Sequence, residues 1–141
     1  MDVKNTDSNE ISHMNISSSG NFRKADLSKL NGKIEFLGLK NIKIIKGNFS
    51  ETMSKSNGFK GDIFASFLDC DLYESYKTCL DFLWSNTIKG GIFYLDEYYS
   101  LKFPGAKIAV DEFVRDKKFQ LINFSGKCDD DFARNVLVKL E

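Results

Sequence analysis

The fold is decided by two stretches of sequence, DIFASFLDCDLYES at residues 62–75 and GGIFYLDEYY at residues 90–99. Each contains a short apolar run that is rich in β-forming residues, at residues 63–68 and 92–95. Such runs are typical of strands that are buried on both faces of a parallel sheet. We therefore expect two neighbouring parallel strands within an α/β fold.

The segment between these strands has the spacing of an amphipathic helix. Its apolar side chains recur at Leu72, Tyr76, Cys79, Leu80 and Leu83. Asp71 is placed to cap the first turn, and Gly90-Gly91 is expected to form the tight turn from helix to strand. Strand, helix and strand together predict a right-handed βαβ unit.

Acidic residues follow both strands. Asp69 comes after the first strand, and Asp96 and Glu97 come after the second. Because the carboxyl ends of parallel strands face one crevice, these carboxylates should converge. Mg²⁺ takes such oxygen ligands, and a metal held there would lower the pKa of a bound hydroxyl, whose proton a carboxylate could accept. The alternative is that Glu97 is solvated, and that Asp71 and Glu74 only favour the helix N-terminus.

Asp69 and Asp71 also form a DxD motif. In nucleotide-sugar transferases such a pair bridges a metal to a diphosphate. Three-residue motifs occur by chance in many soluble proteins, so this one specifies little alone. It supplies a second hypothesis, a glycosyltransferase.

Bulk properties limit the function classes. A chain of 141 residues is one domain at most, and it is short for a complete doubly wound enzyme. Twenty basic residues balance twenty acidic ones, which argues against nucleic-acid or anionic-membrane partners. No leader or membrane-spanning run is seen, so we expect a cytoplasmic protein. Cys70, Cys79 and Cys128 lack paired spacing, which indicates buried thiols rather than a disulfide frame or a zinc site.

The sequence predicts a polar N-terminal arm followed by one partial domain, which contains the βαβ unit. Residues 1–20 are rich in Ser, Asn and Asp and are expected to be disordered, and the lone His13 lies there without a catalytic context. The domain spans residues 21–141. Its further expected elements are a helix from Asp26 to Gly38, a strand at 42–46, a short helix at 48–52, a polar loop at 53–61, a helix at 106–114, and strands at 119–124 and 135–140 that pair as an antiparallel hairpin.

The aromatic residues divide into two groups. One group falls on inferred buried faces and is expected in the core: Phe64, Phe67, Phe82, Phe93 and Phe113. The other lies beside the acidic crevice and is considered for substrate contact, with packing as an equal alternative: Tyr73, Tyr98 and Tyr99.

Several motifs occur together in a specific order. They are LDCDLYES at residues 68–75, GG at 90–91, DEY at 96–98, PGAK at 104–107 and AVDEF at 109–113, preceded by GNF at 20–22 and GNFSET at 47–52. In this order and spacing they resemble the macrocin O-methyltransferase (TylF) family, from about Gly20 to the C-terminus.

The resemblance implies S-adenosylmethionine-dependent methyl transfer to a hydroxyl, commonly on a sugar, with Mg²⁺ or a similar divalent cation. By position, Asp69 matches a metal ligand that also serves as the general base, and Asp96 matches a second ligand. Glu97 stands where the family usually has Asp, which leaves the metal geometry open. The implied cofactor contacts are Gly47, Asn48, Phe49 and Asp69.

The resemblance also implies a missing part. Class I methyltransferases carry a glycine-rich loop after their first strand and an acid after their second, and this sequence has neither. We expect a Rossmann-like sheet that lacks these two strands, so that the strand at 63–68 is an exposed edge or pairs aberrantly with 42–46. The alternatives to an active O-methyltransferase are thus an inactive fragment, or one half of a split enzyme that needs a complementing N-terminal half. Homo-oligomer formation is a further expectation.

Overall fold

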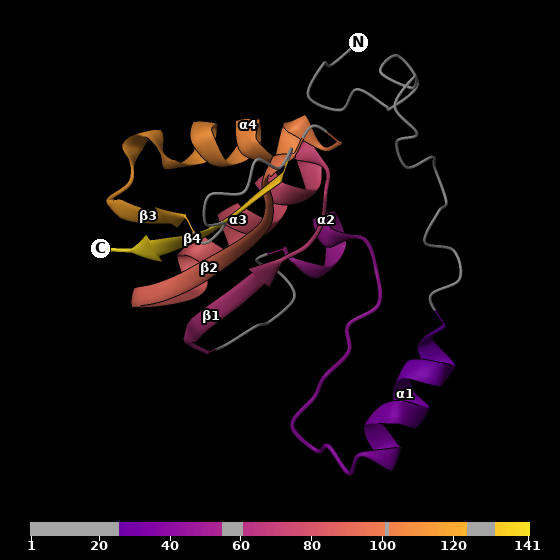
Figure 1. The fold of residues 1–141 in the computed structure, drawn as a ribbon. Coiled ribbons are helices and arrows are strands. Elements are labelled where there is room, and N and C mark those ends of the chain that lie inside the picture. Colours follow the sequence, from indigo (N-terminus) through magenta and orange to yellow (C-terminus); the bar gives the residue numbers. More distant parts are fainter. Residues whose placement is uncertain (1–25, 55–60, 101, 124–131) are drawn as a thin grey trace.

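A computed structural model describes residues 26–54, 61–100, 102–123 and 132–141 (Figure 1). The expected arm at 1–20, with His13, and most of the loop at 53–61 lie outside these residues, as does Cys128. The elements in chain order are α1 (Leu27–Phe36), α2 (Phe49–Thr52), β1 (Ile63–Leu68), α3 (Tyr73–Asn86), β2 (Thr87–Ser100), α4 (Pro104–Phe113), the 3₁₀ helix η4 (Val114–Asp116), β3 (Phe119–Asn123) and β4 (Phe132–Lys139).

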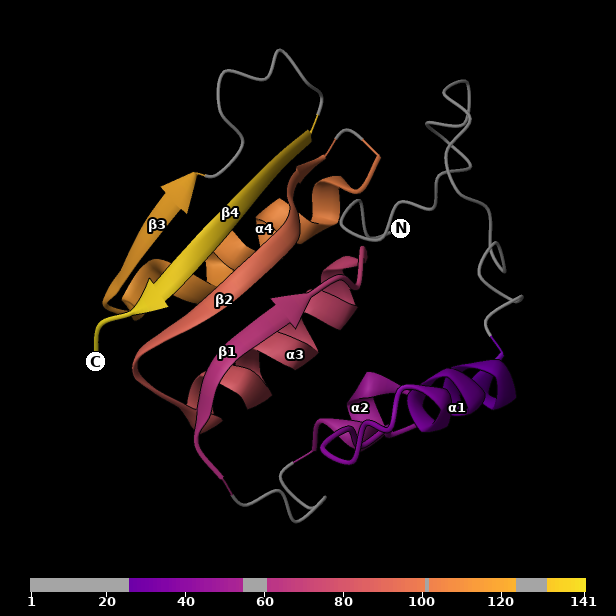
Figure 2. The ribbon, with the colours of Figure 1, turned by 60° about the horizontal axis from the view of Figure 1, so that its bottom comes forward.

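The four strands form one mixed sheet in the order β1-β2-β4-β3. β1 and β2 are parallel and are joined by α3, as the sequence predicts for a βαβ unit. β4 runs antiparallel to both β2 and β3, which confirms the terminal hairpin. α3 and α4 cover one face of the sheet, and no helix of the described residues lies over the other face (Figure 2).

The core lies between the sheet and these two helices. Its largest fully buried side chains are Tyr76, Phe93, Leu80, Leu95, Leu137 and Val110. The indole of Trp84 stacks on the Phe93 ring with a centroid distance of 5.7 Å and meets the Phe113 ring edge-on at the same distance. Helix α3 is thus fixed to the middle of the sheet, with its N-terminus at the carboxyl end of β1.

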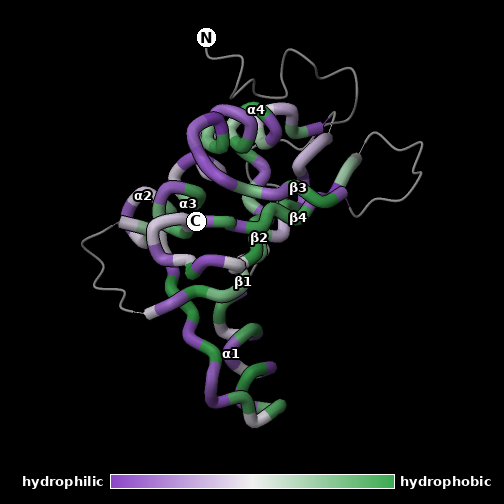
Figure 3. Tube along the Cα trace, turned by 90° about the vertical axis from the view of Figure 1, so that its left-hand side faces the viewer, coloured by the Kyte–Doolittle hydropathy of each residue, from purple (hydrophilic) through white to green (hydrophobic). Residues whose placement is uncertain are grey.

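Helix α1 begins and ends where the sequence predicts. The Asp26 side chain accepts hydrogen bonds from the backbone N–H groups of Ser28 and Lys29, and Gly38 follows the helix with a φ of 64°. The helix has no buried residue and stands away from the sheet (Figure 1). Figure 3 shows hydrophobic residues along α1 and the segment after it.

The strand expected at 42–46 does not form. This segment pairs with no strand of the described residues, and Ile42 and Ile45 are 48% and 59% exposed. The prediction was wrong because apolar alternation describes a strand only when a neighbouring strand accepts its hydrogen bonds.

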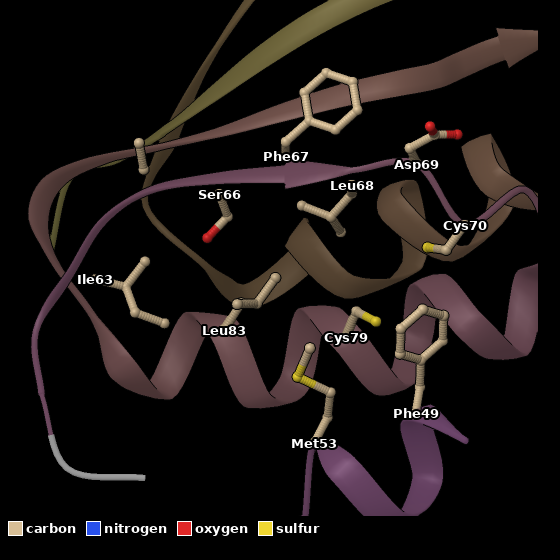
Figure 4. Close-up of a pocket in the computed structure, with 11 residues that line it drawn as sticks. Phe49, Met53, Ile63, Ser66, Phe67, Leu68, Asp69, Cys70, Cys79 and Leu83 are labelled. Atoms are coloured by element: carbon tan, nitrogen blue, oxygen red, sulfur yellow. The ribbon is translucent and has the colours of Figure 1, made fainter. Parts of the chain in front are cut away.

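The core assignment was wrong for two of the five phenylalanines. Phe93 is fully buried, and Phe82 and Phe113 are half-buried. Phe64 and Phe67, however, are 65% and 64% exposed. Phe67 points away from α3, toward the face of the sheet that no described helix covers (Figure 4), where its ring stacks on Tyr94. An apolar run alone does not show whether both faces of a strand are covered.

Gly90 and Gly91 lie inside β2 rather than in a turn before it. The pairing with β1 shifts here, from Ile63 opposite Thr87 to Ala65 opposite Ile92. Gly90 has a φ of 80°, and a Cβ on Gly91 would meet the Phe64 carbonyl oxygen at 3.1 Å. The glycines therefore form a local irregularity of the strand, of the kind that favours glycine.

Candidate active site

Three carboxylates converge at the carboxyl ends of β1 and β2, as the sequence predicts. Asp69 directly follows β1, and Asp96 and Glu97 lie on β2. Each offers an oxygen within 4.8 Å of an oxygen of the other two. Asp69 is exposed and Asp96 half-buried, whereas Glu97 is only 7% exposed. The site is therefore open to solvent at Asp69 and buried in the protein at Glu97.

Asp71 belongs to this cluster and does not cap α3. The N-cap position is Leu72, which gives no side-chain cap, and Asp71 has a φ of 57°. The Asp71 carboxyl instead lies near Asp69 and Glu97, and burial together with the negative charge of Asp69 raises its pKa. The predicted cap was wrong because Asp71 lies one residue before the N-cap position and has a left-handed backbone, whereas a capping residue has an extended one.

Glu97 is the buried member of the cluster. Burial, together with repulsion from Asp71, Asp96 and Asp69, raises its pKa to about 8. Its Oε2 atom is buried and has no hydrogen-bond partner within the described part of the chain. A buried carboxyl among like charges is stabilised either by a proton or by a cation.

Arg134 is a member of the site that the sequence did not reveal. Its Nε donates to Asp96 Oδ1 at 2.9 Å. The pairing of β4 with β2 sets Asn135 opposite Leu95 and so brings the preceding arginine beside Asp96. Only knowledge of this strand register could have indicated the contact, because the two residues are far apart in sequence.

Tyr76 joins the two strand ends beneath the carboxylates. Its side chain is fully buried, and its hydroxyl donates to the Leu68 carbonyl oxygen at 3.1 Å. The same hydroxyl accepts the backbone N–H of Glu97 at 3.4 Å. Burial raises the pKa of Tyr76, so the hydroxyl remains protonated and able to donate. One side chain of α3 thus fixes the spacing between β1 and β2 where the acids emerge.

The tyrosines considered for substrate contact differ in their surroundings. Tyr73 is buried and its hydroxyl donates to Glu112 Oε2 at 2.6 Å. Tyr98 is half-buried and donates to Asp111 Oδ1 at 2.9 Å. Tyr99 is 42% exposed. Tyr73 and Tyr98 therefore hold α4 against α3 and β2, and Tyr99 is the most accessible of the three.

A cavity of about 380 Å³ lies beside the acids, between β1, α2 and α3 (Figure 4). Its lining includes Phe49 and Asp69, two of the implied cofactor contacts, whereas Gly47 and Asn48 are not part of the lining. Asn48 instead accepts the Ser50 N–H at 3.1 Å and so caps α2. The walls are mostly apolar, with Ser66, Asp69 and two thiols as polar groups.

The donor set of the acidic cluster suits a hard divalent cation. Asp69, Asp96 and Glu97 offer carboxylate oxygens, the ligands that Mg²⁺ and similar ions prefer. The buried Oε2 of Glu97 has no hydrogen-bond partner among the described residues, and Arg134 Nε donates to Asp96. The residues present therefore fit a cation at this position.

The sheet, its acidic strand ends and the adjacent cavity define part of an α/β methyltransferase fold. Residues 6–123 match the model of the macrocin O-methyltransferase (TylF) family, so the chain belongs to that family of S-adenosylmethionine-dependent methyltransferases. A comparison with curated proteins gave no match. In the described part of the chain no helix has the length and hydrophobicity needed to cross a membrane.

Solved structures share the fold. The O-methyltransferase NovP is 21% identical with a TM-score of 0.66, over 83% of this chain and 46% of NovP. A putative rRNA-methylase from Clostridium thermocellum is 17% identical with a TM-score of 0.58, over 81% of this chain and 66% of that protein. The calicheamicin methyltransferase CalS11 is 22% identical with a TM-score of 0.53, over 67% of this chain and 36% of CalS11. The chain thus spans less than two thirds of each of these proteins.

Proposed function

We propose that this chain forms the cation-binding and acceptor-binding side of an O-methyltransferase that methylates a hydroxyl of a sugar or of a glycosylated small molecule. Family membership supports methyl transfer from S-adenosylmethionine. The sugar acceptor rests on one relative, since CalS11 is described as a TDP-rhamnose 3′-O-methyltransferase. The observation that carries the proposal is the convergence of Asp69, Asp96 and Glu97 beside the cavity.

Each acid of the cluster would have a different role. Asp69 is exposed and lines the cavity, so its carboxylate can accept the proton of an acceptor hydroxyl that enters from solvent. Asp96 and Glu97 are less exposed and would hold a divalent cation together with Asp69. Such a cation, when bound, would orient the hydroxyl and lower its pKa, while S-adenosylmethionine would supply the methyl group.

The cavity is the proposed contact with the methyl donor. Phe49 offers a flat apolar surface at one wall, and Asp69 stands at the end of the cavity that faces the acids. This arrangement would set the reacting methyl group next to the proton acceptor. Gly47 and Asn48 would act indirectly, because Asn48 caps the helix that carries Phe49.

Turnover would require the rest of the fold. The chain spans 46% of NovP, and β1 is an edge strand of the described sheet, with no strand on its outer side among the described residues. We propose that full activity appears only with the segments that complete the sheet, in the same polypeptide or in a complementing one. The complementing polypeptide would be the expected N-terminal half of a split enzyme. If no such segments exist, the chain is a fragment without activity.

The DxD glycosyltransferase hypothesis is less well supported. Asp69 and Asp71 are both near Glu97, as that motif would allow, but family membership favours methyl transfer.

Calorimetric titration of S-adenosylmethionine, with and without Mg²⁺, tests the proposal. We expect binding by the folded chain that is stronger with Mg²⁺ and is lost in Asp69→Ala. Asp62→Ala is the matched control, since Asp62 is exposed at the opposite end of β1. Binding by Asp69→Ala equal to that of the wild type would contradict the proposed site.

A further inference from the structure

Two aromatic rings stack on the open face of the sheet, the face that no described helix covers (Figure 2). The Phe67 ring of β1 lies nearly parallel to the Tyr94 ring of β2, with an interplanar angle of 9° and a centroid distance of 4.9 Å. Phe67 is 64% exposed, and Tyr94 is half-buried. The pair therefore presents an apolar aromatic surface to solvent, which we call the aromatic stack.

The aromatic stack lies on the same face of the sheet as the two aspartates of the acidic cluster. Side chains two residues apart in a strand share a face, which sets Phe67 with Asp69 and Tyr94 with Asp96. Figure 4 shows Phe67 and Asp69 on the side of β1 that faces away from α3. Two residues of strand span roughly 7 Å. The aromatic stack thus borders the proposed position of the acceptor hydroxyl.

Charged groups border the aromatic stack on the side of the acids. Asp69 is exposed, and the half-exposed Arg134 donates from Nε to Asp96 Oδ1 at 2.9 Å. A wholly apolar partner, such as a hydrophobic helix face, would remove these charges from water without replacing their hydrogen bonds. A sugar ring fits both surfaces, because its C–H face packs on aromatic rings while its hydroxyls hydrogen-bond carboxylate and guanidinium groups.

We propose that the aromatic stack binds the sugar ring of the acceptor and so positions one of its hydroxyls at Asp69. The inference rests on the proposed function, because that function supplies a sugar-containing acceptor. Phe67 and Tyr94 hold the C–H face of the ring, and hydroxyls at the edge of the ring meet Asp69 and Arg134. The two aromatic residues thus bind and orient the acceptor, whereas Asp69 accepts the proton.

Saturation-transfer NMR of the folded chain, with methyl α-rhamnoside as the probe, tests this inference. We expect transfer to the C–H protons of the sugar in the wild type, and an affinity lower by about fivefold or more in Phe67→Ala and Phe67→Leu. Leucine keeps an apolar side chain but has no ring face, so this variant separates stacking from hydrophobicity. Phe67→Trp keeps a ring face and should retain the affinity.

Phe64→Ala is the matched control. Phe64 lies in the same strand with 65% exposure, but strand alternation places it on the opposite face from Phe67. This variant should therefore bind the probe like the wild type. If Phe67→Ala is unfolded by circular dichroism, Phe67→Leu and Phe67→Trp decide the question.

Three outcomes would overturn the inference. They are absence of transfer in the wild type, equal affinity in the wild type and Phe67→Leu, and a wild-type dimer that Phe67→Ala converts to a monomer in light scattering. The last outcome would mean that a second copy of the chain covers the aromatic stack. Titration of S-adenosylmethionine separates these failures from failure of the proposed function: binding that depends on Asp69, without sugar contact, refutes the aromatic stack alone.

Discussion

The buried hydroxyl of Tyr76 accepts the backbone N–H of Glu97, and it also donates to the carbonyl oxygen of Leu68. Glu97 belongs to the acidic cluster, and Leu68 directly precedes Asp69. A residue of α3 therefore sets the distance between two carboxylates that come from different strands. This relationship predicts that Tyr76 positions the site without touching a ligand.

Tyr76→Phe should weaken cation binding and lower stability. The ring remains, but the Leu68 carbonyl and the Glu97 N–H lose a buried partner, which costs about 1–3 kcal/mol of unfolding free energy. Urea denaturation and Mn²⁺ titration measure the two effects. Tyr73→Phe is the matched control, because that buried hydroxyl bonds Glu112, away from the cluster. Equal loss of Mn²⁺ affinity in the two variants would contradict a positioning role for Tyr76.

Stability without added cation should fall as the pH rises from about 4.5 to about 8. The folded state holds the Glu97 proton up to a pKa of about 8, whereas the unfolded chain releases it near the ordinary value of 4.5. Protonation thus favours the folded state within this window, and Asp71, whose pKa is also raised, acts with the same sign. Urea denaturation across the window measures the slope.

Glu97→Gln is the control for this pH dependence. The amide keeps the size of the side chain but does not titrate, so the free energy of unfolding should depend much less on pH in this variant. A pH dependence as steep as that of the wild type would show that Glu97 is not its source. Cation affinity of the wild type should rise over the same window, because binding must displace the proton.

Arg134→Gln should strengthen cation binding several-fold. The guanidinium neutralises Asp96 and competes for its oxygen, so its removal leaves the cluster more negative. Because the arginine side chain is half exposed, stability should change little. Lys118→Gln removes an exposed cation that faces Glu141 and should leave Mn²⁺ affinity unchanged. Weaker binding in Arg134→Gln would mean that the arginine supports the site instead of competing with the cation.

Leu80→Ala should destabilise the fold by about 2–5 kcal/mol, since the side chain is fully buried between α3 and the sheet. Leu72→Ala, at a position 53% exposed, should cost far less. Urea denaturation of both variants gives the difference. Similar losses in the two would contradict the packing of α3 described here.

The local parts of the fold could be predicted from the sequence. The Asp26 cap, the β3–β4 hairpin and the buried stripe of α3 at Tyr76, Cys79 and Leu80 depend on residues close together in the chain, and they formed as expected. Leu72, the first residue of the predicted stripe, is instead the N-cap residue and is 53% exposed. The convergence of Asp69 with Asp96 and Glu97 followed from the parallel pairing of two strands.

What could not be predicted depends on long-range contacts or on backbone conformation. The strand at 42–46 required a partner strand, and the Arg134 contact required the register of β4 on β2. Asp71 lies one residue before the N-cap position of α3 with a left-handed backbone, a conformation that residue type alone does not determine.

The most direct test of the central claim is a titration of the folded chain with Mn²⁺, followed by electron paramagnetic resonance of the free ion. The account predicts one Mn²⁺ per chain, displaced by Mg²⁺. It also predicts affinity about tenfold lower or more in Asp69→Asn, but unchanged in Asp62→Asn. Absence of Mn²⁺ binding by the folded wild type, or equal affinity in Asp69→Asn, would contradict the assignment of these carboxylates as a cation site.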